Sequence, residues 1–281
     1  MHLTKYFFLA ALSSLVFLGC ANKILAQSES SDQSKPVFET QAETLSKDIR
    51  QLKIQYRGEL EEYRRLENQY QIAREQYEKL ETLASLDDAV QKTKEVMRSR
   101  ADVLHTYLRL LRLNLLSQTG IELPEKQAAE QDLLASLRVV EQHQQKLKTA
   151  VDKPQLAELT TEFEVLVEEV EEAAYRSLSV MAIGKLQTVH DKTLVLKSDM
   201  QEKLATAGGA LRSAERRRSF DETDRVLAKL KTEFDLVEAQ IIDPGSSSGF
   251  KGVYRALDDR LSSIHSSLSQ VMSFLGELLK I

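Results

Sequence analysis

Apolar residues recur at helical spacing along almost all of the chain after residue 36. The clearest stretch runs from Val37 to Ala84, where two series of positions advance in steps of seven residues. Steps of this kind are the a/d pattern of heptad-repeat helices, and they predict one long helix over Val37–Ala84. The first series is Ala42, Ile49, Tyr56, Tyr63, Tyr70, Tyr77 and Ala84; the second is Phe38, Leu45, Leu52, Glu59, Leu66, Ala73 and Leu80.

The first series contains a ladder of tyrosines: Tyr56, Tyr63, Tyr70 and Tyr77. One interpretation is an aromatic surface that stacks on a glycan or a partner. The other is a packed seam whose rings lie on a neighbouring helix while the hydroxyls reach water at its edge. We favour the packed seam, because the ladder continues an aliphatic stripe. If the neighbouring helix belongs to another protein, this seam is the candidate partner-facing surface.

Five more helices are predicted from periodicity, proline positions and capping residues. Ser85 and Asp88 have roughly the spacing of a capping box, Asp152 is expected to cap a helix that starts at Pro154, and Ser219 with Glu222 is expected to open another. The predicted helices are Leu86 to about Gly120, Glu125–Val151, Pro154 to about Gly208, Phe220–Ile242 and Phe250–Leu279, with a loop at 243–249.

Two of these segments have unusual apolar faces. Between Leu104 and Leu116 the face widens to most of the circumference, which indicates either a central, buried helix or a helix on a membrane surface; we favour burial. In the helix after Pro154 the stripe changes phase before Gly184, where a kink, a close helix crossing or a short break is expected. Its stripe then resumes at Leu186, Val189, Thr193, Leu196 and Met200.

The composition agrees with helices. The chain has only 10 glycines and 4 prolines in 281 residues, and strong helix formers dominate it. We therefore predict an all-α fold, an elongated antiparallel helical bundle or coiled coil of about six long helices over residues 37–281. The stretches 37–151 and 154–281 resemble each other in outline, and each begins at a Lys-Pro pair, Lys35-Pro36 and Lys153-Pro154. A duplicated three-helix unit is therefore an alternative division.

The N-terminus has the order of an export signal. Lys5 precedes an apolar run that is too short to span a bilayer comfortably, and small residues follow. Residues 1–26 are therefore predicted to be a signal peptide or an N-terminal membrane anchor. The residues before Cys20 partly match a bacterial lipobox, which makes Cys20 a candidate lipidation site. Residues 27–36 are polar and serine-rich, and we expect them to be a linker.

No catalytic or cofactor motif is found along the chain. With a single cysteine, no intrachain disulfide can form. Asp102 and His105 lie three residues apart, but a second copy of such a pair is missing, so we interpret them as part of a solvated polar stripe. The net charge of −5, with acids and bases mixed, argues against binding to nucleic acid. We expect no enzyme activity, no metal and no cofactor.

These observations favour an exported structural or adaptor protein of the cell envelope that binds a protein partner, or a second copy of itself, through long helices. The expected location is periplasmic, cell-surface or extracellular, with membrane attachment through the signal or a lipid as one form. One alternative is a membrane-acting protein that binds lipid or forms pores, motivated by the leucine-rich stretch. Another is an extracytoplasmic helical sensor or binding domain.

Overall fold

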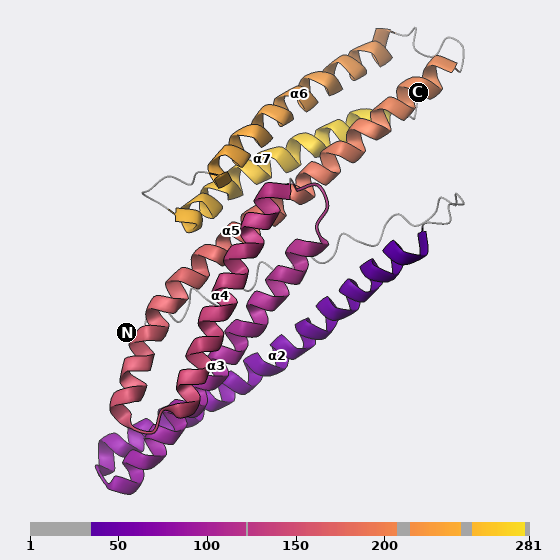
Figure 1. The fold of residues 1–281 in the computed structure, drawn as a ribbon. Coiled ribbons are helices and arrows are strands. Elements are labelled where there is room, and N and C mark those ends of the chain that lie inside the picture. The colour runs from indigo at the N-terminus through magenta and orange to yellow at the C-terminus, as the bar shows by residue number, and fades with distance from the viewer. Residues whose placement is uncertain (1–34, 122, 207–213, 243–248, 279–281) are drawn as a thin grey trace. The chain divides into compact units, whose positions relative to one another are not determined.

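A computed structural model describes residues 35–121, 123–206, 214–242 and 249–278, and these residues contain six helices and no strand. The predicted all-α fold is confirmed. The chain divides into two units, 1–41 and 42–281, and the contacts below lie within the second unit. The helices are α2 (Lys35–Leu80), α3 (Leu83–Ser117), α4 (Leu123–Thr149), α5 (Lys153–Thr206), α6 (Ala214–Ile242) and α7 (Gly249–Leu278) (Figure 1).

The boundary between α2 and α3 lies earlier than the sequence pattern predicts. α2 ends at Leu80, and Thr82, not Ser85, is the N-cap of α3. The Thr82 hydroxyl accepts a hydrogen bond from the Ser85 backbone N–H at 3.2 Å, and the Thr82 N–H donates to Ser85 Oγ at 3.1 Å. The prediction that Ser85 opens the helix was therefore wrong, because Ser85 is the third residue of the helix and completes the capping box.

Of the capping residues predicted for α5 and α6, the first is confirmed and the second is wrong. Asp152 Oδ1 accepts from the Gln155 N–H at 3.0 Å, which confirms the predicted cap of α5. By contrast, Ser219 lies inside α6, where its carbonyl oxygen accepts from Thr223 Oγ1 at 2.8 Å. Ser219 was therefore wrongly predicted to open a helix, because α6 extends through the preceding arginines. The predicted stop at Gly208 and most of the 243–249 loop lie outside the described residues.

α5 is the helix that all the others except α2 approach closely. Its first part contacts α3 and α4, as in the 3.6 Å contact of Thr160 Oγ1 with Met97 Sδ. Its second part contacts α6 and α7, as in the ring pair of His190 with Phe234 at 5.5 Å between centroids (Figure 1). α5 is continuous, so the short break is excluded among the three alternatives predicted before Gly184. The phase changes because the buried face moves from one pair of neighbours to the other.

The close approach at Gly184 involves a loop. Ile121, in the loop between α3 and α4, lies so near Gly184 that a Cβ on the glycine would overlap its side chain. Thr188 Oγ1, one turn later, lies 2.9 Å from the carbonyl oxygen of Thr119 and donates to it. The loop is thus fixed on α5 where the helix needs a residue without a side chain.

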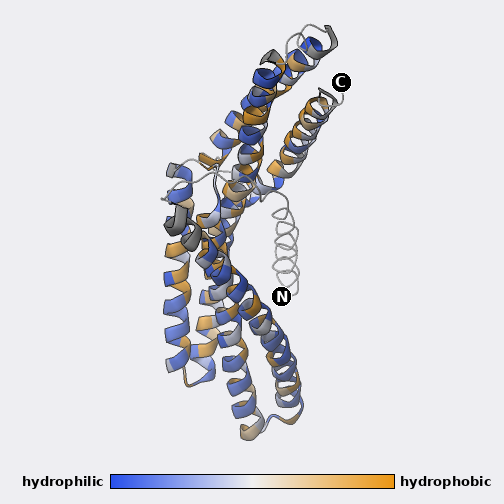
Figure 2. Ribbon diagram, turned by 90° about the vertical axis from the view of Figure 1, so that its right-hand side faces the viewer, coloured by the Kyte–Doolittle hydropathy of each residue, from blue (hydrophilic) through white to orange (hydrophobic). Residues whose placement is uncertain are grey.

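Most predicted apolar stripes are buried. The leucine-rich stretch of α3 lies inside the chain, with Leu108, Leu111 and Leu115 fully buried, so the preference for burial is confirmed. Figure 2 shows hydrophobic and hydrophilic positions mixed along each helix, as amphipathic packing requires. Several stripe residues were wrongly predicted to be buried, and Ala42 and Ala84 of the first heptad series are among the exposed ones. Leu80 and Val151 lie at or beyond helix ends and are exposed, and Val189 is exposed while its neighbour His190 is buried.

Candidate interaction surface along α2

α2 is held against the chain by few buried side chains. Among its residues 42–80 only Leu52 and Ala73 are buried, and both belong to the second heptad series. The helix pairs whose backbones approach one another repeatedly all lie among α3 to α7. The seam of α2 contains large tyrosine side chains, and large side chains at a helix contact hold the two helix axes further apart.

The structure places all of Tyr56, Tyr63, Tyr70 and Tyr77 in a half-buried environment. The Tyr56 ring lies 6.1 Å from that of Tyr107 on α3, between centroids, and Lys153 Nζ lies 5.3 Å from the centroid of the Tyr77 ring. Burial raises the pKa of Tyr56 to about 12 and also raises the pKa of Tyr63. The tyrosines thus lie along the chain's own helices, and a role toward a partner stays a prediction.

The hydroxyl of Tyr56 does not reach water, although the packed-seam interpretation predicted that the tyrosine hydroxyls would do so. Its hydroxyl oxygen is buried and has no hydrogen-bond partner among the described residues. A buried hydroxyl without a partner weakens packing, because its lost hydration is not replaced. The contact between α2 and α3 is therefore not optimised around this residue.

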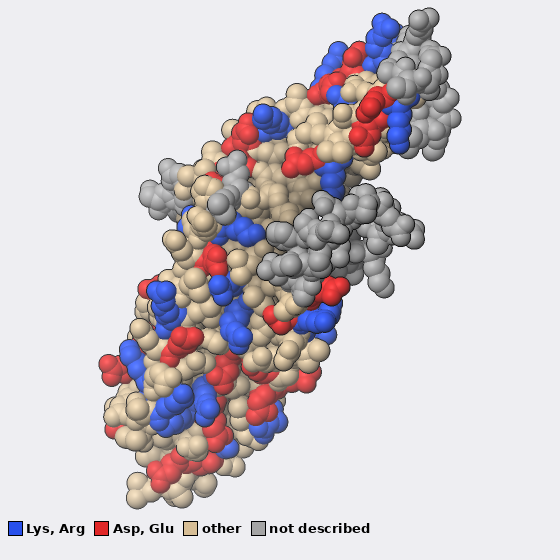
Figure 3. Space-filling model, turned by 45° about the vertical axis from the view of Figure 1, so that its right-hand side comes forward, with Lys and Arg blue, Asp and Glu red and all other residues tan. Residues whose placement is uncertain are grey.

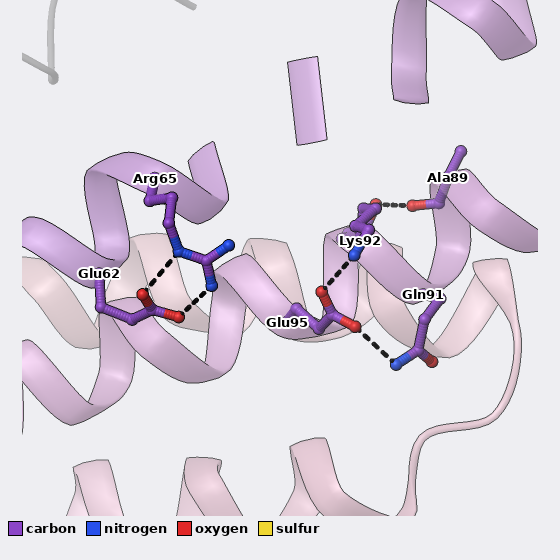
Figure 4. A network of polar contacts seen from close by, with 7 residues as sticks. Glu62, Arg65, Ala89, Gln91, Lys92 and Glu95 are labelled. Carbon is purple, nitrogen blue, oxygen red and sulfur yellow. Dashed lines mark hydrogen bonds and ion pairs between the residues drawn. The ribbon is translucent and has the colours of Figure 1, made fainter. Parts of the chain in front are cut away.

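The α2–α3 contact includes polar groups, both at its edge and at the buried Thr106. Gln55 Nε2 on α2 donates to Thr106 Oγ1 on α3 over 3.4 Å. Figure 4 shows Glu62 and Arg65 of α2 near Glu95 of α3, which accepts from Lys92 and Gln91. The hydrogen bond from Lys92 is the main reason that the pKa of Glu95 is lowered, and Arg65 adds a smaller effect. Lys92 and Glu95 are half-buried and still in contact with water, which screens their charges, so this ion pair contributes little to stability.

The side of α2 that faces away from the seam carries exposed apolar residues. Ile54 is 72% exposed and Ile72 is 58% exposed. They are separated by about five helical turns, so they point in the same direction, roughly 27 Å apart along the axis. Gly58 follows Ile54 by one turn, and no atom lies within 4 Å of the Cβ it lacks. This outer face of α2, defined by Ile54, Gly58 and Ile72, has no contact that explains it within the described chain.

The Asp102–His105 pair is an interhelix contact. Asp102 Oδ1 accepts from Gln144 Nε2 on α4 at 2.7 Å, and His105 Nε2 lies 3.2 Å from Glu141 Oε1. Partial burial raises the pKa of Asp102. The interpretation as a solvated stripe was therefore wrong in part, because α4 covers this side of α3. No group of three or more metal-ligating side chains occurs among the residues that the structure describes, and Cys20 lies outside them.

A buried histidine was missed in the sequence. His143 on α4 is fully buried, both ring nitrogens lack hydrogen-bond partners among the described residues, and its ring lies 5.1 Å from that of Phe163 between centroids. Glu162 Oε1 is 3.6 Å from Nδ1, too far for a hydrogen bond. The spacing from Val140 and to Leu147 on the same apolar stripe was the signal that could have identified it.

We expect His143 to make stability depend on pH. Burial lowers its pKa below the ordinary 6.5, with Glu162 opposing that effect, and Lys146 and Arg100 adding to it. Below pH 6.5 the histidine takes up a proton in the unfolded chain, whereas the buried His143 of the folded chain does not. The free energy of unfolding therefore decreases as the pH is lowered, by at most about 1.4 kcal/mol per pH unit, until the lowered pKa of the folded chain is reached. Urea unfolding at pH 7.5, 6.0 and 5.0 measures this slope.

His143→Leu should remove this part of the slope, and the exposed His265→Leu should retain it. Equal slopes for the wild-type chain and His143→Leu would contradict the assignment.

No protein-family model, curated protein or solved structure matches this chain. The function must therefore be argued from the chain's own residues.

Proposed function

We propose that the protein is an exported adaptor of the cell envelope that binds a protein partner through α2. The observation that carries the proposal is the outer face of α2, where Ile54 and Ile72 are exposed on one side of a helix whose residues 42–80 bury only Leu52 and Ala73. Exposed apolar side chains aligned along a helix are typical of surfaces that dock on a partner helix or groove. The signal-like pattern of residues 1–26 supports export.

Gly58 adds a second argument for a helical partner. A glycine inside an exposed helix costs about 0.5–1 kcal/mol relative to alanine. No neighbour in the described chain needs the space beside it. A partner helix could approach the backbone of α2 closely at this point, in contact with Ile54 one turn away.

The charge distribution favours a protein as the partner. Figure 3 shows Lys and Arg side chains interspersed with Asp and Glu over the face that it draws. Nucleic acid and anionic lipid both call for concentrated positive charge. The leucine-rich stretch that motivated a membrane-acting alternative is used in the core, and no described helix is long and apolar enough to cross a membrane.

Site-specific photo-crosslinking in cells tests the proposal. A photoreactive amino acid at Ile54 or Ile72 is expected to give a discrete adduct with another protein in the envelope fraction, because both positions lie on the outer face of α2. The matched control is Val165 on α5, a similarly apolar residue that is 56% exposed. The same adduct from Val165, or no adduct from either α2 position, would overturn the proposal.

A further inference from the structure

The junction between α2 and α3 is built differently from every other helix junction. The α3–α4 junction contains Gly120, the α4–α5 junction is followed by Pro154, the α5–α6 junction contains Gly208, and the α6–α7 junction contains Pro244. The α2–α3 junction consists of Glu81 and Thr82 only, and no glycine or proline occurs between Gly58 and Gly120. The sequence therefore contains no helix breaker at this turn.

Glu81 adopts a backbone conformation that its side chain disfavours. Its φ is 49°, and it is the one non-glycine residue with positive φ among the residues that the structure describes. This left-handed region brings Cβ close to the backbone carbonyl oxygen, so a residue with a side chain is strained there. Straightening the chain at Glu81 would release that strain.

The capping box stabilises the turn in spite of the strain at Glu81. Thr82 and Ser85 exchange the two hydrogen bonds that begin α3, and both would be lost if the helix continued through the turn. The residues on both sides favour helix, since the stretch EKLETLASL consists mostly of strong helix formers. The first heptad series also passes through the turn, from Tyr77 to Ala84, without a change of step. The bent form is thus stabilised by the capping box, and the straight form by the release of strain at Glu81 and by a continuous helix.

The interface of α2 with α3 is suited to exchange between chains. On the α2 side only Leu52 and Ala73 are buried among residues 42–80, so removing α2 from α3 does not unpack a core of fully buried α2 side chains. A second copy can restore the same contacts, including Tyr56 beside Tyr107, without any new complementary surface. Short, strained connections are known to favour such exchange.

We propose that Glu81–Thr82 is a hinge, and that its opening merges α2 and α3 into one helix whose α2 segment packs on α3 of a second copy of this chain. The product is a symmetric dimer in which each chain contributes its α2 to the other. The outer face of α2 stays exposed in both forms, so this inference is independent of the partner proposed above.

Crosslinking distinguishes the two arrangements directly. In the full chain carrying Cys20→Ser, Gln55→Cys and Thr106→Cys place one thiol on α2 and one on α3, at side chains that lie within 3.4 Å of each other. A short bis-maleimide reagent joins them within one chain in the monomer and between two chains in the exchanged dimer. Denaturing gels after incubation at increasing protein concentration should show a growing product of doubled mass.

Hinge variants should shift this equilibrium in opposite directions. Thr82→Ala with Ser85→Ala removes the capping box from the bent form, a loss equivalent to about fivefold in equilibrium constant per chain. Because both chains of the dimer carry the two substitutions, its dissociation constant should fall by about 25-fold. Glu81→Gly relieves the strain of the bent form and weakens the merged helix, so it should raise the dissociation constant by at least a similar factor.

Asp152→Ala is the matched control. It removes the side-chain cap of α5, but Pro154 prevents α4 and α5 from merging, so the dimer fraction should not change. Two results would overturn the hinge: crosslinked product of single-chain mass alone at every concentration, or an increase with Asp152→Ala equal to that of the Thr82/Ser85 variant. Glu81→Gly favours the observed turn and decides the question even if the double variant does not fold.

Discussion

Leu111→Ala is expected to lower the free energy of unfolding by about 2–5 kcal/mol. Leu111 on α3 is 0% exposed, and it lies between two other fully buried leucines, Leu108 and Leu115. Truncation removes buried apolar surface and leaves a cavity that the surrounding helices close only in part. Urea unfolding followed by circular dichroism at pH 7.5, above the range in which His143 contributes, measures the difference.

Leu83→Ala provides a control on the same helix. Leu83 is 80% exposed at the start of α3, so its truncation should change the free energy of unfolding by less than about 0.5 kcal/mol. A loss at Leu111 no larger than the loss at Leu83 would show that the leucine-rich stretch is not in the core, and would restore the membrane-surface interpretation of that segment.

Gly120→Ala is expected to lower the free energy of unfolding by about 2–4 kcal/mol. Gly120 has a φ of 79°, which strains any residue with a side chain. An alanine Cβ would also overlap Thr188 Oγ1 and lie 2.7 Å from the carbonyl oxygen of Gly184. Thr188 cannot move away without losing its hydrogen bonds to Thr119 and Gly184. Thermal and urea unfolding measure the loss.

A glycine-to-alanine substitution at Gly58 separates the strain expected at Gly120 from the general effect of replacing a glycine. Gly58→Ala meets no atom and extends a helix with a better helix former, so it should raise stability by about 0.5–1 kcal/mol. If Gly120→Ala were as stable as the wild-type chain, the loop between α3 and α4 would not be fixed on α5 as described.

The predicted stripes succeeded where one helix face packs on one set of neighbours. The stripe of α6 is an example, since Phe220, Leu227, Phe234 and the residues between them on that face are buried. They failed where neighbours change along one helix. On the second part of α5 the chain buries His190 and exposes Val189, because α6 and α7 together fix which of two adjacent residues points inward. Hydrophobicity alone favours valine over histidine.

The candidate surface was predicted in part. Heptad spacing identified Tyr56, Tyr63, Tyr70 and Tyr77 as a seam, because side chains seven residues apart share a helix face. It said nothing of the opposite face, since Ile54 and Ile72 fit no heptad and count as isolated residues in the sequence. Their exposure becomes informative only once the neighbours of α2 are known.

The sequence by itself determined that this chain forms long helices and, through Pro154, Asp152 and the apolar stripes, where several of them begin and which face is buried. Those features depend on local backbone preferences and on the period of the helix. Tertiary structure decided that the turn between α2 and α3 lies at Glu81 and Thr82, a few residues before the predicted boundary at Ser85, and that α5 lies between two pairs of neighbours. The physical reason is that both depend on packing between segments far apart in the chain, which can impose a strained turn that the local sequence does not favour.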